Sequence, residues 1–341
     1  MSSYQVALDA MGGDHGPSVV VPAALNALVH FPDLELILVG DRKQIEPRLH
    51  RAAASERERL HIRHAAEVVA MDEPPSQALR NKKDSSMRVA INLVKEGQAA
   101  ACVSAGNTGA LMATGRYVLK TLSGIDRPAI IAALPSKQGH TQMLDLGANV
   151  DCTAEHLYEF AVMGSVVCEV VDGISKPRIG LLNIGQEIIK GNEQVKQAGA
   201  RLERSDLNYI GYVEGDDIYL GGVDVVVCDG FVGNVSLKTS EGVAKLISGL
   251  MRSEFKRNPL TKLAGLVAQP VMHGLRKRID PRLYNGASLV GLRGVVIKSH
   301  GGTDRIGFEN AIRIARLEAE ANVTQRISNN LKQLLNQRLV S

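Results

Sequence analysis

Six short segments of the sequence combine glycine with Asp, Asn, Lys or His directly after an apolar run. They are DAMGGDHGP (9–17), SAGNTGAL (104–111), LDLGAN (144–149), LNIGQEIIKGN (182–192), CDGFVGNVSLK (228–238) and KSHGG (298–302). Glycine lets the backbone approach a ligand closely, and the first turn of a helix presents free N–H groups to an anion. The side chains in these segments that can donate hydrogen bonds or positive charge include Asn107, Thr108, Asn234, Lys190, Lys238 and His300. Such a lining suits phosphate or a thioester.

A simpler structural role is also open for many of these residues. Asp14 can cap a turn, and Lys190 and Lys238 can be solvated surface charges. Either Asp229 or Asn234 can cap the helix that follows them. The argument for a site is that all six segments follow predicted strands, which we expect to end at one shared edge of a sheet.

Several familiar motifs are absent from the sequence. It has no GxxxxGK[ST], no GxGxxG after the first strand, no GxSxG and no HExxH. These absences argue against a P-loop nucleotidase, a dinucleotide-binding enzyme, a serine hydrolase and a zinc protease. The nine His residues show no metal spacing, and no CxxC pair is formed by Cys102, Cys152, Cys168 and Cys228. We therefore expect no metal, no cofactor, and reduced thiols in a cytosolic protein.

The composition is that of an ordinary globular protein with a mild positive charge. The chain has 341 residues, of which 45% are hydrophobic and 22% charged, and its formal net charge is +4. This charge favours an acidic partner, a phosphorylated substrate or an anionic membrane. With no Trp, five Phe and seven Tyr, the chain has few aromatic platforms for nucleic-acid bases, so we expect no nucleic-acid partner. We find no signal peptide and no apolar run that could span a membrane.

Short apolar runs alternate with helical patterns along the chain. Strands are expected at 5–10, 34–40, 60–65, 99–106, 128–136, 141–149, 177–185, 207–215, 223–230 and 294–302. Helices are expected at 18–29, within 41–49, and at 84–97, 151–171, 234–251 and 308–335, with Asp151 as the N-cap of the helix at 151–171. This alternation predicts one α/β catalytic domain over 1–341, with three layers and a mostly parallel, Rossmann-like sheet covered by helices on both faces. Ligands bind beyond the carboxyl ends of the strands in such sheets.

The stretch 250–282 departs from this alternation. It carries eight Lys or Arg residues and is interrupted by Pro259, Pro270 and Pro281. The apolar residues that share one helical face, and continue after the break, are Leu260, Leu263, Leu266, Val267, Val271 and Leu275. We expect a protruding helical insertion that makes a dimer contact, a contact with the membrane surface, or both.

Taken together, these segments resemble the PlsX family of bacterial acyl-acyl-carrier-protein:phosphate acyltransferases. The resemblance runs through 7–17, 84–113, 144–152, 180–193, 225–242 and 284–302, in the family's order and over essentially the whole chain. SAGNTGAL and DGFVGNVSLK are its most specific parts. Two departures are Gln186, where the family has Glu, and Asn285, where it has Gly. Gln186 puts any acid–base role at that position in doubt, whereas Glu187 is retained.

The resemblance implies transfer of a fatty acyl group from acyl carrier protein to inorganic phosphate, which yields acyl phosphate for phosphatidic acid synthesis. It also implies a fold like those of phosphotransacetylase and isocitrate dehydrogenase. Implied partners are a second copy in a homodimer, the membrane surface, and an acyl-phosphate glycerol-3-phosphate acyltransferase. A phosphotransacetylase-like enzyme that uses acyl-CoA, and a non-catalytic docking module, are the alternatives.

Roles for individual residues follow as expectations. Because phosphate is itself the nucleophile, no Ser or Cys nucleophile is needed. The residues expected to be catalytic are Lys190, Lys238, His15, His300 and Asp229. The residues expected to bind substrate are Asp9, Gly12, Gly13, Asp14, Ser104, Gly106, Asn107, Thr108, Gly109, Asn149, Glu187, Gly233 and Asn234. The lysines and the 104–109 loop would hold phosphate and the oxyanion, one of the two His residues would handle the proton, and Asp229 would orient one of these groups.

Overall fold

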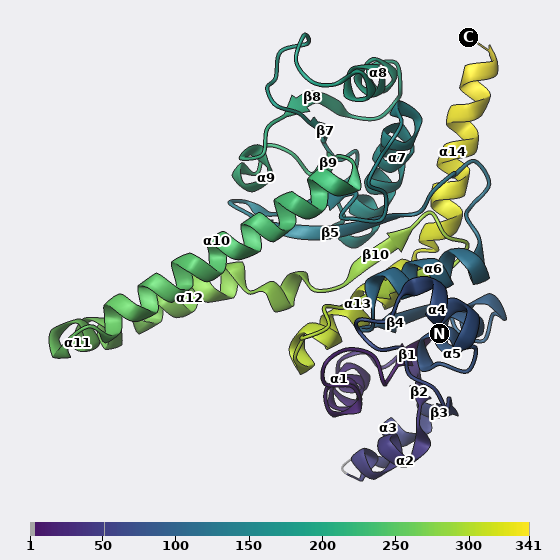
Figure 1. Ribbon diagram of the computed structural model, residues 1–341, viewed down its shortest axis with the longest axis vertical. Coiled ribbons are helices and arrows are strands. Elements are labelled where there is room, and N and C mark those ends of the chain that lie inside the picture. The colour runs from purple at the N-terminus through teal and green to yellow at the C-terminus, as the bar shows by residue number, and fades with distance from the viewer. Residues whose placement is uncertain (1–3, 51, 341) are drawn as a thin grey trace.

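Eleven strands form one sheet in the computed structural model, which describes residues 4–50 and 52–340 (Figure 1). The strands are β1 (Tyr4–Asp9), β2 (Leu34–Gly40), β3 (Leu60–His64), β4 (Ala101–Ser104), β5 (Ala129–Ser136), β6 (Gly139–Leu144), β7 (Ile179–Leu182), β8 (Tyr209–Val213), β9 (Val225–Val227), β10 (Ala287–Val290) and β11 (Val295–Lys298). Their spatial order is β3-β2-β1-β4-β11-β10-β5-β6-β9-β7-β8. The expected α/β sheet is therefore confirmed.

The sheet consists of two parallel halves that run in opposite directions. In the first half β3, β2, β1, β4 and β11 are parallel, and in the second half β6, β9, β7 and β8 are parallel. Between them the pairs β11–β10, β10–β5 and β5–β6 are antiparallel. Because three reversals separate the halves, the strands of the second half point opposite to those of the first. Their carboxyl ends do not share one edge, which corrects the expectation of a single edge.

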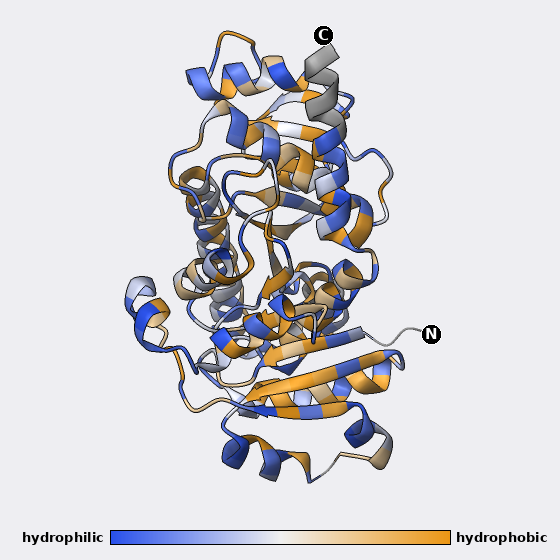
Figure 2. Cartoon of the chain, turned by 90° about the vertical axis from the view of Figure 1, so that its right-hand side faces the viewer, coloured by the Kyte–Doolittle hydropathy of each residue, from blue (hydrophilic) through white to orange (hydrophobic). Residues whose placement is uncertain are grey.

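Helices cover both faces of this sheet, as the alternation predicts. They are α1 (Pro17–His30), α2 (Arg42–Ile45), α3 (Ala54–Glu58), α4 (Pro75–Asn81), α5 (Ser86–Lys95), α6 (Thr108–Leu119), α7 (Ala154–Val171), α8 (Glu193–Leu202), α9 (Asp217–Leu220), α10 (Gly230–Lys256), α11 (Pro259–Val267), α12 (Gln269–Ile279), α13 (Arg305–Glu320) and α14 (Val323–Val340), with short 3₁₀ turns η1 (Glu46–Leu49) and η2 (Pro281–Tyr284). Figure 2 shows hydrophobic strands between helices with hydrophilic outer faces.

Alternating side chains along the strands divide the core between the two faces. On β1, Ala7 packs with α5 and α6, whereas Val6 and Leu8 pack with α1 and α13. On β5, Ile130 faces the α5–α6 side and Ile131 faces α7. Successive strand residues point to opposite faces, so strands covered on both sides must be apolar throughout. This accounts for the unbroken apolar runs of the sequence.

Several helix boundaries differ from the sequence prediction; α10, for example, runs over Gly230–Lys256 instead of 234–251. The last helix does not run unbroken through 308–335, since α13 ends at Glu320 and α14 starts at Val323. Asn322 between them adopts the left-handed conformation, with φ 51°, which Asn tolerates better than most residues. The N-cap of α7 is Thr153 rather than Asp151, and its hydroxyl accepts a hydrogen bond from the N–H of His156.

The stretch 250–282, here called the helical arm, comprises the end of α10, then α11, α12 and η2, and it extends from the body of the protein (Figure 1). Pro259, Pro270 and Pro281 each lie in the first turn of a new helix, where the missing N–H costs nothing. Leu260 and Val267 are more than three-quarters exposed. Among the described residues, each helix is too short or too polar to cross a membrane.

Candidate functional site

The carboxyl ends of β1, β4 and β11 are neighbours in the first half of the sheet. Leu8 pairs with Val103, and Ser104 pairs with Lys298. The loops that follow these three strands also touch, because the N–H of Asp14 donates to the carbonyl of Gly301 at 2.9 Å. We call these loops, residues 9–17, 104–109 and 298–302, the strand-end cluster. The structure therefore brings three of the six candidate segments together.

Asp9 connects two of these loops from inside the protein. Its Oδ1 accepts from the N–H of Gly12 at 3.1 Å, and its Oδ2 accepts from the hydroxyl of Ser104 at 2.6 Å. The same Ser104 oxygen accepts from the N–H of Gly106 at 3.0 Å. Burial raises the pKa of the Asp9 carboxyl, while the hydrogen bonds lower it. Asp9 and Ser104 thus shape the loops rather than face a ligand.

Glycine is required where these loops approach each other. A Cβ atom on Gly12 would lie 2.8 Å from the backbone nitrogen of Gly106, and one on Gly13 would lie 2.8 Å from the carbonyl oxygen of Gly301. Gly13 also has φ 84°, a conformation that residues with a side chain rarely adopt. The glycines therefore allow the loops to pack closely, which supports their selection from the sequence.

The 104–109 loop leads into α6 with Asn107 as its N-cap. The Oδ1 atom of Asn107 accepts from the N–H of Ala110 at 2.9 Å, and its Nδ2 atom donates to the carbonyls of Met71 and Glu73. The Asn107 side chain is therefore occupied by the fold. Thr108 and Gly109 follow as the first residues of α6, whose N–H groups have no partner within the helix. These backbone groups, rather than the Asn107 amide, are the donors that an anion could use.

Lys298 is the residue of this cluster that sequence reasoning missed. Its side chain is 8% exposed, and its Nζ atom donates to the backbone carbonyls of Ala105 and Ser299. No carboxylate lies within ion-pair distance of it in the described part of the chain. Burial lowers the pKa of Lys298 to about 8, while Asp9 and Asp14 act to raise it. A buried ammonium group without a paired carboxylate favours an anionic ligand.

The sequence does contain a signal for Lys298. It is a charged residue at the end of the apolar run GVVIK, whose other residues are buried. A lysine there must be placed at the very end of a strand, and its charge must find a partner. The sequence analysis selects His300 from this segment and does not select Lys298.

His300 and Asp14 lie at the exposed side of the cluster. The Nδ1 atom of His300 accepts from the N–H of Gly302 at 3.1 Å, which leaves Nε2 to carry the proton of the neutral ring. The backbone N–H of His300 donates to Oδ1 of Asn285 at 2.8 Å, and Nδ2 of Asn285 donates to Ser299. Asn285, noted above as a departure from the family pattern, thus holds this loop. The exposed ring of His15 makes no hydrogen bond or ion pair with the rest of the described chain.

A second group of candidate residues lies at the ends of β6 and β9, in the other half of the sheet. The buried Asp145 carboxylate accepts from the N–H groups of Ile130, Ala148 and Asn149 and from the Asn149 amide. The second hydrogen of that amide goes to the carbonyl of Pro128 at 2.8 Å. The donors of the Asn149 side chain are therefore both used by the fold.

α10 begins directly against this loop. Asp229 is its N-cap and accepts from the N–H of Val232 at 2.8 Å, which decides between the two candidate caps. A Cβ atom on Gly233 would lie 1.9 Å from the carbonyl oxygen of Asp145, so only glycine fits there. Asn234 is exposed and lies beside Gly147. Asp229, Gly233 and Asn149 thus make the α10 junction.

Lys238 links the two groups of loops. It lies eight residues after Gly230, the first residue of α10, which is about 12 Å along the helix axis. Its charge lowers the pKa of Lys298. The Lys238 Nζ atom is 3.0 Å from Glu241, and its side chain is more than half exposed. Lys238 on α10 is therefore near enough to Lys298 for the two charges to interact.

Lys190 and Glu187 lie apart from both groups, in the loop after β7. They form an exposed ion pair at 2.9 Å, and the hydrogen bond between them raises the pKa of Lys190 and lowers that of Glu187. Their loop also bonds to itself through Asn183 and Lys190. In the described chain, no hydrogen bond or ion pair joins this loop to the strand-end cluster.

The cysteines offer no activated nucleophile. Burial raises the pKa of the thiols of Cys102, Cys168 and Cys228, and it raises that of Cys152 to about 12. All four are free thiols. A nucleophilic cysteine requires a lowered pKa. The arrangement therefore suits a reaction in which a bound anion, and not a cysteine, attacks.

Comparison with known proteins shows the family of this chain. The model of the family described as "Fatty acid synthesis protein" matches residues 4–326. The chain belongs to this family. A relative from Alkalilimnicola ehrlichii named phosphate acyltransferase is 64% identical, over 98% of this chain and 97% of its own length. One of the same name from Legionella pneumophila strain Paris is 57% identical over the full length of both. These relatives confirm the resemblance to the bacterial phosphate acyltransferases.

Solved structures of this fold include two phosphotransacetylases. The one from Streptococcus pyogenes has a TM-score of 0.62 at 17% identity, covering 94% of both chains. The EutD phosphotransacetylase from Staphylococcus aureus has a TM-score of 0.59 at 14% identity, covering 93% of this chain and 94% of its own. At such low identity the likeness shows the fold alone. It confirms the expected phosphotransacetylase-like architecture of the family member described here.

Proposed function

We propose that this protein transfers a fatty acyl group from acyl carrier protein to inorganic phosphate and releases acyl phosphate. A phosphate oxygen attacks the thioester carbonyl carbon, a C–O bond forms, and the C–S bond breaks. The thiol of the carrier protein leaves as thiolate and takes up a proton. The observation that carries this proposal is the buried, unpaired Lys298 at the meeting point of three glycine-containing loops. The relatives named phosphate acyltransferase support it.

Within the strand-end cluster, each group has a task that its position supports. Lys298 and the N–H groups of Thr108 and Gly109 bind the phosphate dianion, and Lys238 adds positive charge from α10. Positioned donors of this kind are typically worth about 10²–10³ in rate each. The proton that the phosphate loses when the C–O bond forms passes to the departing thiolate, and His300 and His15 are the candidates to carry it.

The residues of the second half have supporting tasks in this proposal. Asp229 and Asn149 fix the start of α10 and thereby the direction from which Lys238 approaches. Lys190 and Glu187 lie on an exposed loop with Ile184, Ile188 and Ile189, each about four-fifths exposed. That combination of charge and apolar surface suits contact with the acyl donor away from the reacting carbonyl.

The donor is tested by turnover of palmitoyl-acyl-carrier-protein and palmitoyl-CoA, each with and without inorganic phosphate, with hydroxylamine trapping the product as a hydroxamate. We expect phosphate-dependent hydroxamate from the carrier-protein thioester, with a rate that falls as salt is raised, because the carrier is acidic. Turnover of palmitoyl-CoA alone would support a phosphotransacetylase-like reaction instead. No turnover of either donor would leave a non-catalytic docking module.

For the helical arm we propose contact with a second subunit, with the membrane surface, or with both. Its exposed Leu260, Leu263 and Val267 have no partner within the described chain, and Lys and Arg residues are interspersed with them. Vesicle flotation with anionic phospholipid and sedimentation of the free protein separate the two contacts. A Leu263→Glu change should weaken whichever contact is made, and a protein that is monomeric and does not float would exclude both. Membrane contact would place the product near the glycerol-3-phosphate acyltransferase that consumes it.

A further inference from the structure

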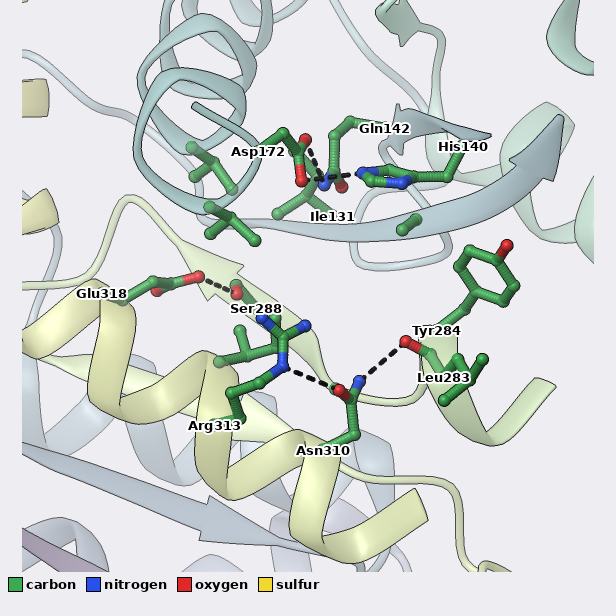
Figure 3. Close-up of a pocket in the computed structure, with 15 residues that line it drawn as sticks. Ile131, His140, Gln142, Asp172, Leu283, Tyr284, Ser288, Asn310, Arg313 and Glu318 are labelled. Atoms are coloured by element: carbon green, nitrogen blue, oxygen red, sulfur yellow. Dashed lines mark hydrogen bonds and ion pairs between the residues drawn. The ribbon is translucent and has the colours of Figure 1, made fainter. Parts of the chain in front are cut away.

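A cavity lies between α7 and α13, on the opposite face of the sheet from α5 and α6. Its volume is about 190 Å³, and it is lined by residues of β5, β6, β10, α7, α13 and η2 (Figure 3). None of its lining residues belongs to the six loop segments considered above. It lies between the two halves of the sheet, since β6 and α7 come from one and α13 packs on the other.

One side of this cavity carries a carboxylate whose two oxygens both have hydrogen-bond partners. The Asp172 carboxylate at the end of α7 is 2.7 Å from Nε2 of His140 and accepts from the amide of Gln142 at 2.9 Å. The hydrogen bond that His140 makes with the Asp172 carboxylate raises the pKa of His140. Each Asp172 oxygen thus has a hydrogen-bond partner, and the negative charge of Asp172 also acts to raise the pKa of Arg313.

The other side carries a cation without a carboxylate. The Arg313 guanidinium of α13 points into the cavity, and its Nε atom donates to Oδ1 of Asn310 at 2.9 Å (Figure 3). No carboxylate in the described chain lies within ion-pair distance of it. Burial lowers the pKa of Arg313, while the charge of Asp172 acts to raise it.

Glu318 lies one turn further along α13, yet it does not supply that counter-ion. Its carboxyl is 2% exposed and its contact is with the hydroxyl of Ser288. Burial raises the pKa of Glu318 to about 7, so near neutral pH a large share of these carboxyls is uncharged. Arg313 is therefore a half-buried cation of the cavity wall without an ion pair in the described part of the chain.

The remaining wall is apolar. It is formed by Ile131, Val167, Val171, Leu283 and Ile314. A cavity of about 150 Å³ holds a benzene molecule, so this one has room for about six to eight non-hydrogen atoms. Its lining therefore combines one cationic end with a short hydrophobic wall.

We propose that this cavity binds a short-chain monocarboxylate, whose carboxylate pairs with Arg313 and whose alkyl chain lies against the apolar wall. The proposed ligand bridges the two halves of the sheet, because it touches α7 of one and α13 of the other. Binding should therefore raise the melting temperature of the protein. This inference does not depend on the acyl transfer proposed above.

Binding of acetate, butyrate and hexanoate to the full chain, measured by calorimetry and thermal melting, tests the proposal. The measurements are made at constant ionic strength and with saturating inorganic phosphate, which occupies the other anion site. We expect affinity to rise from acetate to hexanoate and to fall at least tenfold in Arg313→Gln. Arg313→Lys should retain much of the binding, because it keeps the charge.

Arg316 on the same helix provides a matched control. It is three residues from Arg313, pairs with Asp33 at 2.7 Å and does not line the cavity, so Arg316→Gln should bind hexanoate like the unchanged protein. Equal affinity for all three carboxylates, or hexanoate affinity that is the same in Arg313→Gln, would overturn the proposal. The second result would place hexanoate outside this cavity.

Discussion

The two sets of strand ends use the same residue types with different results. At the ends of β6 and β9, Asp145, Asn149 and Asp229 direct their polar atoms into the fold, where the backbone N–H and C=O groups pair with them. At the ends of β1, β4 and β11, Lys298 is buried, and its hydrogen-bond partners in the described chain are two carbonyls, while the N–H groups of Thr108 and Gly109 have no partner within α6. The first arrangement is complete without a ligand. The second holds positive charge that a phosphate dianion would neutralise.

This contrast shows that residue type after a strand does not reveal function, whereas pairing and burial do. Glycine, Asp and Asn follow strands in both places because tight loops need them. The difference is whether a buried charge has its counter-ion within the protein. By that criterion we propose the strand-end cluster as the phosphate site and the β6–β9 loops as its support.

The largest effect is expected from Lys298→Met. We predict a loss of about 10³-fold in kcat/KM for phosphate, because the buried cation proposed to bind the attacking phosphate is removed. The melting temperature should not fall, since the pKa of Lys298 is lower in the folded protein, about 8, than in the unfolded chain. Its charge therefore opposes folding below pH 8. Steady-state kinetics and calorimetry on the same preparation check both statements, with Lys298→Arg as the control that keeps the charge.

The opposite result is expected from Asp145→Ala in the second half. The change leaves four hydrogen-bond donors without an acceptor, so the free energy of unfolding should fall by about 3 kcal/mol. The activity per folded molecule should remain within a few-fold of the unchanged enzyme. Urea unfolding measures the first quantity, and Asp229→Ala, which loses one cap worth about 1 kcal/mol, is the matched control. A stable but inactive Asp145→Ala protein would contradict the contrast.

The pH dependence of phosphate use should separate the two regions further. Lys298 is protonated below its pKa of about 8 and loses its charge as the pH rises through that value. We therefore expect kcat/KM for phosphate to fall up to tenfold per pH unit above pH 8. Lys298→Arg should flatten this limb of the profile, because Arg keeps its charge. Measuring kcat/KM from pH 6.5 to 9.5 in both proteins would show whether the limb belongs to Lys298.

A smaller effect is expected at the two exposed lysines. Lys238→Ala should lower kcat/KM about tenfold, mainly through a higher KM for phosphate, because Lys238 acts on the strand-end cluster from α10. Lys190→Ala should change turnover less and should alter the KM for the acyl donor, since its loop makes no described contact with the cluster. Varying each substrate in turn distinguishes the two patterns. The reverse assignment of the KM effects would exchange their roles.

Much of the fold could be predicted because the apolar runs of the sequence indicate the strands. Strands covered on both faces must be apolar, and the helices between them show their caps and prolines. The sequence analysis does not predict the short strand β10 (Ala287–Val290). Its antiparallel pairing with β5 and β11 contributes to the reversal of strand direction in the sheet. The break at Asn322 is not predicted either, because the apolar pattern continues past it and the helix is interrupted only by the left-handed φ of Asn322.

The site was less predictable for the same physical reason. The sequence analysis selects six loops after strands. The structure separates them into groups, because the strand direction reverses in the middle of the sheet. This reversal depends on pairing between strands that are distant along the chain. Asn107 and Asn149 were selected as ligand donors, whereas their amides are used by the fold. Lys298 was missed because its significance comes from burial and the lack of a nearby carboxylate. Sequence patterns do not display either property.

Calorimetric binding of inorganic phosphate to the unchanged protein, Lys298→Met and Lys190→Met tests the central claim most directly. The measurement needs no acyl donor, so it examines the anion site apart from turnover. The account predicts that phosphate binding is lost in Lys298→Met and retained in Lys190→Met. Phosphate binding that is unchanged in Lys298→Met but lost in Lys190→Met would contradict it and move the site to the loop after β7.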